Sequence, residues 1–210
     1  VVDAVDGSKL DNDFSKSYMP RLLRPYYPFR LRSAEVACFQ SHRKCWQEIL
    51  DQGLEAALII EDDVDIIDGE FTAAVKLAMK EIKMGDLIRL PIKPREKPRS
   101  KILKLDNISI FEPTLVGLGT QAQIVTYDAA RRLLESTKRF DRPIDVYLQL
   151  RWKHGVRILT LWPNGMRERS SSLGGSLIGE ERKDRDKLRR ELLRPLYRAK
   201  VKFFSLIKKS

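Results

Sequence analysis

Short apolar runs alternate with longer amphipathic segments along most of this 210-residue chain. The clearest run, residues 56–60, is apolar at every position, which is typical of a strand buried on both faces of a parallel sheet. Residues 33–52 and 70–84 instead carry apolar side chains at three- and four-residue spacings, the pattern of an amphipathic helix. This alternation predicts an α/β fold with a mixed, mostly parallel sheet flanked by helices.

The same patterns predict the remaining elements. We expect further strands at residues 1–7, 86–90, 102–105, 108–111 and 156–161 and one ending near Val125, with helices at residues 128–135 and beginning near Pro143. Residues 93–101 are rich in Pro and in charge, so they are expected to form an exposed loop.

The C-terminal part of the chain differs in charge from the rest. We assign residues 1–170 to one domain and residues 171–210 to a linker and a helical tail. Most of the formal net charge of +11 lies in residues 182–210, which hold 12 basic and 3 acidic residues. Apolar residues recur there at helical spacing, namely Leu188, Leu192, Leu196, Ala199, Phe203 and Ile207. This predicts an amphipathic helix, kinked at Pro195, on an anionic membrane surface; a solvated or partner-binding helix is the alternative.

Cysteine content and hydropathy limit the class of protein further. Cys38 and Cys45 lie seven residues apart in a predicted helix, which separates their backbones by about 10 Å, too far for a disulfide. Free cysteines favour a reducing compartment, so we expect a cytoplasmic protein peripheral to the inner membrane. The longest apolar run is far shorter than the roughly 20 residues that span a bilayer. Nucleic-acid binding is not expected, because no stacking-aromatic motif accompanies the basic tail.

Four carboxylates follow the central apolar strand directly, at Glu61, Asp62, Asp63 and Asp65. In open α/β sheets, ligands bind beyond the carboxyl ends of the strands, where these acids fall. Mn²⁺ and Mg²⁺ take oxygen ligands, commonly one or two carboxylates together with substrate phosphates. We therefore predict a divalent metal site, with Mn²⁺ preferred, at Glu61, Asp63 and Asp65; a solvated acidic turn is the alternative. A calcium loop is excluded, because its sixth position would be Ile66 instead of Gly.

Several short blocks occur along the chain in a characteristic order. They are Asp3-Ala4-Val5-Asp6-Gly7, Ser33-Ala34-Glu35-Val36-Ala37-Cys38-Phe39-Gln40-Ser41-His42, Ile59-Ile60-Glu61-Asp62-Asp63, Gly119-Thr120-Gln121-Ala122 and Arg142-Pro143-Ile144-Asp145. In this order they resemble glycosyltransferase family 25, which contains lipooligosaccharide galactosyltransferases. The resemblance extends from residue 1 to about residue 165.

The resemblance implies a GT-A-like fold, a UDP-sugar donor and a divalent ion at Glu61, Asp62 and Asp63. It also implies transfer of a hexose, preferentially galactose, with inversion, to a glycan or glycolipid acceptor. The basic tail favours a bacterial lipopolysaccharide acceptor. Family members usually begin with a strand and an Arg-rich turn that help to hold the nucleotide, and this sequence begins after them. A catalytically inactive glycan-binding or scaffolding remnant is therefore the alternative.

Positions that match the family blocks are expected to bind the donor. They are Asp6, Glu35, His42, Glu61, Asp62, Gly119, Thr120 and Gln121. Glu35 and His42 share a helical stripe with Phe39 and Trp46, which turns both toward the core. His42 is then either a structural residue or one that orients the acidic strand end.

A carboxylate must also remove the proton from the acceptor hydroxyl. Asp145 is the first candidate and Asp141 the alternate. Asp145 follows Pro143 at a helix start, where a carboxylate also stabilises the helix dipole, and both interpretations stay open. His154 is a weaker candidate for a metal ligand, with an ordinary surface histidine as the other interpretation.

Overall fold

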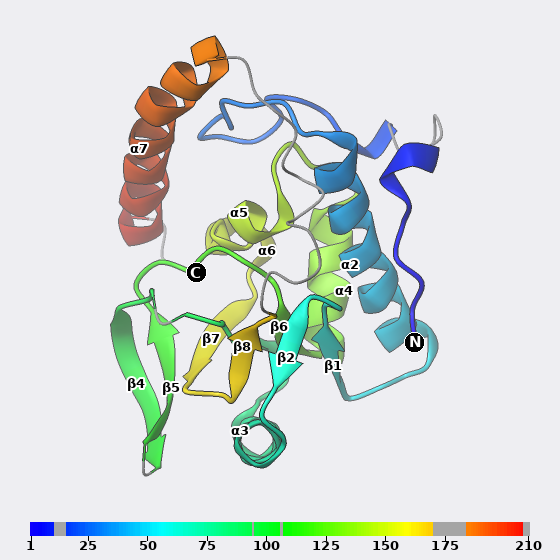
Figure 1. Ribbon diagram of the computed structural model, residues 1–210, viewed down its shortest axis with the longest axis vertical. Helices are drawn as coiled ribbons and strands as arrows, with labels where there is room; N and C mark the ends of the chain where they lie inside the picture. Colours follow the sequence, from blue (N-terminus) through cyan, green and yellow to red (C-terminus); the bar gives the residue numbers. More distant parts are fainter. Residues whose placement is uncertain (11–15, 94, 106, 170–183, 208–210) are drawn as a thin grey trace.

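The computed structural model describes residues 1–10, 16–93, 95–105, 107–169 and 184–207, and the fold is α/β as predicted. Helices cover both faces of a six-stranded sheet (Figure 1). In spatial order its strands are β1 (Ala56–Ile60), β6 (Ala122–Thr126), β3 (Asp86–Arg89), β7 (Arg157–Trp162), β5 (Ile108–Pro113) and β4 (Pro98–Leu105). A second, two-stranded sheet pairs β2 (Val64–Ile66) with β8 (Met166–Glu168).

The expectation of a mostly parallel sheet is wrong. Of the pairings between described strands in the large sheet, that of β3 with β7 is parallel and the other four are antiparallel. β1, β3 and β7 do run in one direction, but β6 lies between β1 and β3 and runs against both. β1 is therefore an edge strand, which explains why its residues are partly exposed instead of fully buried.

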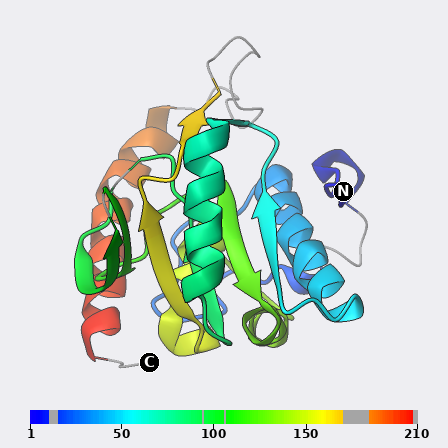
Figure 2. The ribbon, with the colours of Figure 1, turned by 90° about the horizontal axis from the view of Figure 1, so that it is seen from below.

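Two apolar cores lie on the two faces of the sheet. The first is covered by α2 (Ser33–Asp51), α4 (Tyr127–Ser136) and α5 (Ile144–Leu148), and α6 (Arg151–His154) follows α5. The second is covered by α3 (Asp68–Glu81), which lies along the opposite face of the strands (Figure 2). Successive strand residues alternate between the cores: Leu87 enters the first and Ile88 the second.

The predicted N-terminal strand is absent from the described residues, and that prediction is wrong. This segment is extended but unpaired, and it ends in the short 3-10 helix η1 (Gly7–Lys9). It lies against α2, where the Val5 amide donates to Ser41 Oγ (2.9 Å) and Lys44 Nζ donates to the Asp3 carbonyl (2.7 Å). Its β-branched residues predict a strand, but no neighbouring strand edge is there to pair with them.

For the strands predicted around residues 102–111, the structure differs from the prediction only in where an element begins. The strands predicted at residues 102–105 and 108–111 are confirmed and pair as a hairpin, although β4 begins at Pro98, so the end of the predicted exposed loop is a strand. Cys38 and Cys45 are both free, as their spacing predicts. None of the helices in the described residues combines the length and apolarity needed to cross a membrane.

The C-terminal helix α7 (Asp184–Ile207) packs beside α5 and α6 and contains Pro195 (Figure 1). Its inner face is Tyr197 and Val201, which are buried against Val146 and Leu150. The outer face carries exposed apolar side chains, each at least 60% exposed: Leu192, Leu196, Phe203, Leu206 and Ile207. Most of the apolar positions recognised in the sequence therefore face away from the domain.

Candidate active site

A cavity of about 380 Å³ opens where β1 ends and β6 begins. Its walls come from α2, from these two strand ends, from the loop and helix around α5, and from α7. Six of the residues predicted for the site line it: Glu35, Glu61, Gly119, Thr120, Gln121 and Asp145. They come from four separate parts of the sequence, so the fold brings residues of different family blocks together in one cavity.

The antiparallel pairing of β1 with β6 forms the centre of this cavity. Because the strands run in opposite directions, the end of β1 lies beside the start of β6, with Ile60 opposite Ala122. The Glu61 amide donates to the Gln121 carbonyl (2.8 Å), which extends the pairing by one step. Thr120 Oγ1 then donates to Glu61 Oε1 (2.6 Å) and fixes the carboxylate.

His42, on α2, contacts the same carboxylate. The ring is buried on α2, with Nε2 3.1 Å from Glu61 Oε1 and Nδ1 2.9 Å from the amide nitrogen of Gln123. Since the Gln123 amide donates to Nδ1, the proton lies on Nε2 and points at Glu61. His42 does not line the cavity, and its contact with the cavity wall is with Glu61. That His42 orients the acidic strand end stays a prediction, with which this geometry is compatible.

These contacts set the charge state of Glu61. Partial burial favours the neutral acid, but hydrogen bonds from His42 and Thr120 outweigh it, so the pKa of Glu61 is lowered. Glu61 is therefore a fixed anion in the cavity wall at neutral pH.

Asp145 has the opposite environment. Loss of hydration raises its pKa, and the backbone amides of Gly119 and Val146 oppose the rise without cancelling it. Those amides donate to the two carboxylate oxygens at 3.1 Å and 2.7 Å. A carboxylate with a raised pKa at a cavity wall is suited to accept a proton from a hydroxyl group.

The loop that precedes β6 is held by a buried ion pair that no sequence pattern predicted. Arg89 and Glu96 pair with each other and are almost fully buried. Arg89 Nη2 donates to the Gly119 carbonyl (2.6 Å), and Glu96 Oε1 accepts from the Gly117 amide (2.6 Å). Gly119 has a φ of +93°, a conformation that side-chain-bearing residues rarely adopt. The loop backbone is therefore tightly packed at these glycines.

The remaining acids of the cluster do not line the cavity with Glu61. Asp62, Asp63 and Asp65 are exposed. Asp65 lies on β2 and faces Arg169, with 3.9 Å between Oδ1 and Nε. Within the described residues, Glu61, Asp63 and Asp65 do not form one group of closely spaced ligand atoms, so the structure does not assemble the predicted triad.

Glu61 and Asp63 nevertheless suit a hard cation. Asp63 is exposed on the surface, but its carboxylate has lost part of its hydration, which raises its pKa; the negative charge of Glu61 is the next cause. The two carboxylates are thus close enough to repel each other, and a divalent ion would relieve that repulsion. The oxygen donor set fits Mn²⁺ or Mg²⁺.

Cys38 is a cavity residue that the sequence interpretation missed. Its thiol, His42 and Glu61 have ligand atoms within 4.8 Å of one another. Loss of hydration and the neighbouring carboxylates raise the pKa of Cys38 to about 12, so the thiol stays protonated. The signal was present in the sequence, because Cys38 precedes His42 by four residues and shares its helix face.

Two predicted site residues lie elsewhere. Asp141 is fully buried in an ion pair with Arg142 (2.6 Å) and also accepts from the Leu23 amide (2.8 Å), so it has no access to a substrate. Asp6 is exposed and caps η1 by accepting from the Ser8 amide (2.9 Å). Neither lines the cavity.

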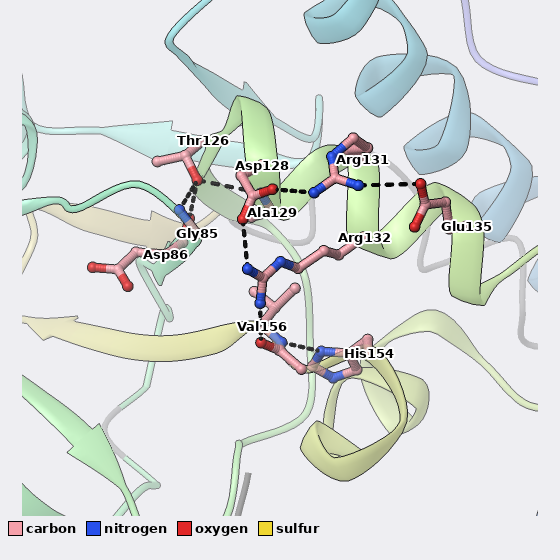
Figure 3. Close-up of polar contacts among 11 residues, drawn as sticks. Gly85, Asp86, Thr126, Asp128, Ala129, Arg131, Arg132, Glu135, His154 and Val156 are labelled. Atoms are coloured by element: carbon pink, nitrogen blue, oxygen red, sulfur yellow. Dashed lines mark hydrogen bonds and ion pairs between the residues drawn. The ribbon is translucent and has the colours of Figure 1, made fainter.

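His154 is a buried structural residue instead of a surface one. Nδ1 accepts from the Val156 amide (3.1 Å; Figure 3), and Nε2 lies 3.2 Å from the Leu148 carbonyl. Burial lowers the pKa of His154 to about 4, so the ring is neutral. Both nitrogens are occupied by the backbone, which leaves none for a metal ion.

The family of the chain follows from its similarity to known proteins. The model of glycosyltransferase family 25 (LPS biosynthesis protein) matches residues 1–148, well over half of the chain. The chain belongs to glycosyltransferase family 25. The matched residues include all the residues that line the cavity except Gln149 and the three from α7, Arg194, Tyr197 and Arg198.

Family 25 relatives include proteins named as galactosyltransferases and proteins named as inactive. The chain is 31% identical to the probable inactive glycosyltransferase 25 family member 3 of Bos taurus, over 71% of the chain and 26% of that protein. It is 28% identical to procollagen galactosyltransferase 2 of Mus musculus, over 74% of the chain and 26% of that protein. The chain therefore spans about a quarter of the length of these relatives.

Proposed function

We propose that this family 25 chain transfers a hexose, galactose first, from a UDP-sugar to a glycan acceptor of the lipopolysaccharide type. The observation that carries the proposal is the cavity at the β1 end, where Glu61 is held as an anion while Asp145 has a raised pKa. Two carboxylates with different proton affinities in one cavity suit the two tasks of the reaction, which are to bind a cation and to accept a proton.

In this reaction Asp145 accepts the proton of the acceptor hydroxyl as its oxygen attacks the anomeric carbon. The bond to UDP breaks on the opposite side, so the configuration inverts. Glu61 and Asp63 would hold a divalent cation, which supplies Lewis-acid neutralisation of the diphosphate. Thr120 and His42 keep Glu61 charged and oriented. The aromatic rings of Tyr27 and Phe29 also line the cavity, where they would limit the access of water to the reacting groups.

A UDP-release assay tests the proposal. The purified chain is incubated with UDP-galactose, Mn²⁺ and a lipopolysaccharide-derived acceptor, and the release of UDP is followed. We expect Glu61→Gln to lower the rate by roughly a hundredfold or more, because a fixed anion at the cation site is lost. Asp65→Asn removes an equal charge outside the cavity and should stay within about threefold of wild type. EDTA should abolish the activity, and Mn²⁺ should restore it.

An inactive glycan-binding protein is the second candidate, because relatives over 30% identical are described as inactive. The two candidates differ in one measurement. An inactive chain would bind glycan without releasing UDP from any common nucleotide-sugar donor, whatever the metal ion. That result, obtained with protein shown to be folded, would overturn the transferase proposal.

We further propose that α7 associates with an anionic membrane surface on the cytoplasmic side. Its exposed apolar side chains stand beside exposed Lys and Arg, namely Arg198, Lys200 and Lys202. Apolar burial in the headgroup region together with basic residues is the usual basis of interfacial binding. An acceptor carried by a lipid would then reach the cavity from the same surface.

A further inference from the structure

The helix α7 does more than cover the domain, because it completes the cavity. Arg194, Tyr197 and Arg198 line it together with residues of the family match. The family model ends at residue 148, so these three side chains come from outside the matched region. A part of the chain that the family blocks do not include therefore forms one wall of the candidate active site.

The position of α7 is fixed by specific contacts. The Tyr197 hydroxyl accepts from Arg142 Nη1 at 2.6 Å, and Arg142 is itself fully buried. The Tyr197 ring meets Tyr27 edge to face at 5.3 Å between centroids. Further along the helix, Phe204 stacks on Trp152 at 6.0 Å. These contacts hold the helix in one orientation relative to the cavity.

That orientation makes two arginines part of the cavity lining. Arg194 and Arg198 are four residues apart on one helix face, so their Cβ atoms are about 6 Å apart. Arg194 lies over the ring of Phe29, 6.0 Å from its centroid. In the part of the chain that the structure describes, neither arginine forms an ion pair with a carboxylate.

The cavity therefore has one negatively charged wall and one positively charged wall. Glu35, Glu61 and Asp145 provide its acidic wall, and α7 provides cationic groups. Arginine binds phosphate through parallel N–H donors, whereas carboxylates accept from the hydroxyl groups of sugars. A ligand with a phosphate at one end and hydroxyl groups at the other matches both walls.

We propose that Arg194 and Arg198 form a phosphate-binding subsite at the mouth of the cavity. This inference rests on the proposed function for the identity of its ligand, which is a phosphate ester of a sugar or nucleotide. Two sources share this chemistry: the diphosphate of the donor and a phosphate group on the acceptor.

Binding measurements test the subsite without requiring turnover. Isothermal titration of the full chain with UDP, uridine and glucose 6-phosphate separates the donor diphosphate, its nucleoside alone and an acceptor-like phosphosugar. The test variant is Arg194→Ala/Arg198→Ala, and the matched control is Lys200→Ala/Lys202→Ala, which removes the same charge from exposed positions of α7 outside the cavity. Thermal unfolding checks that both variants keep α7 in place.

We expect the Kd of at least one phosphate probe to rise tenfold or more in the arginine variant and less than twofold in the lysine variant. A rise for UDP with unchanged uridine binding assigns the donor diphosphate; a rise for glucose 6-phosphate alone assigns the acceptor. Arg194→Lys/Arg198→Lys should recover part of the loss, since it restores charge but not paired donors. Equal binding of both phosphate probes to wild type and arginine variant would overturn the subsite.

The outcomes also separate this subsite from the transferase proposal. Arginine-dependent phosphate binding without UDP release from any donor would leave the subsite standing and remove the transferase. Sugar transfer with an unchanged KM for donor and acceptor in the arginine variant would support the transferase and overturn the subsite.

Discussion

Glu61, Asp141 and Asp145 are carboxylates with different partners, and those partners decide what each can do. Asp141 is fully buried against Arg142. Glu61 accepts from Thr120 and His42 but remains in the cavity wall. Among the described residues, the hydrogen bonds to Asp145 come from backbone amides. The residue type and the adjacent Pro143 predicted a carboxylate function near residues 141–145, but they could not separate the structural acid from the candidate base.

Paired substitutions should separate these two roles. We expect Asp145→Asn to lower kcat by roughly 10²- to 10⁴-fold, because no proton acceptor remains, while the free energy of unfolding changes little. Asp141→Asn should lower the free energy of unfolding by about 3–5 kcal/mol, because it leaves the Arg142 charge buried and unpaired. Donor turnover and chemical denaturation measure both quantities.

The pH dependence of the wild type adds a check on the same assignment. Since the pKa of Asp145 is raised, kcat/KM should fall as pH decreases through a value above the ordinary aspartate range. Full activity of the Asp145→Asn variant would contradict the assignment.

His154 makes the stability of the fold depend on pH. The unfolded chain takes up a proton at His154 below about pH 6.5, whereas burial lowers the folded pKa to about 4. Stability is therefore complete above pH 6.5 and declines as the pH falls from 6.5 to 4. The loss amounts to roughly 3 kcal/mol across that window.

Chemical denaturation at a series of pH values measures this loss. His154→Gln does not titrate, so its free energy of unfolding should decline less than that of wild type between pH 6.5 and 4. Lys153→Gln changes the exposed neighbouring residue and should keep the wild-type slope. Equal slopes for wild type and His154→Gln would refute the assignment.

At the scale of elements, the helices follow from their own residues. Phe39, Trp46 and Ile49 are buried on α2 as their spacing predicts. Its first turn is closed by Glu35, which accepts from the Arg32 amide at 2.8 Å, so Arg32 is the N-cap of the helix. Such local features depend on residues close in sequence, and the sequence predicts the ends of α2 to within one residue and those of α3 to within three.

Strand pairing depends on segments far apart, and the sequence did not predict it. The apolar residues of β1 are compatible with either neighbour direction, and nothing in them specifies that β6 lies beside β1. Yet this antiparallel pair brings Thr120 to Glu61. The position of α7 could not be predicted for the same reason: it depends on a contact between Arg142 and Tyr197, which are 55 residues apart in the sequence.

The contact between Arg142 and Tyr197 should control the docking of α7. Tyr197→Phe removes the hydroxyl that accepts from a buried guanidinium, which costs roughly 1–3 kcal/mol. We expect a lower free energy of unfolding and faster amide hydrogen exchange in α7. Tyr26→Phe removes an exposed hydroxyl and should behave as wild type. Unchanged exchange in α7 of the Tyr197→Phe variant would show that the apolar contacts alone hold the helix.

On the scale of the whole molecule, α7 has two faces with different tasks. The inner face closes the cavity through Tyr197, and the outer face carries apolar side chains among basic ones. An exposed apolar row on a docked helix has no partner within the described residues. Association with an anionic surface would bury this row and attract the basic residues, each contributing about 1 kcal/mol close to the membrane.

Flotation with vesicles tests this arrangement on the full chain. We expect wild type to float with vesicles containing anionic lipid and much less with neutral vesicles, with binding that weakens as salt rises. Leu196→Ser/Phe203→Ser should reduce flotation at least fivefold, because it removes two exposed apolar groups without changing the charge. Met84→Ser/Leu105→Ser removes exposed apolar groups on other parts of the surface and should float as wild type does. Equal flotation of all three proteins would mean that the outer face of α7 does not contact the membrane.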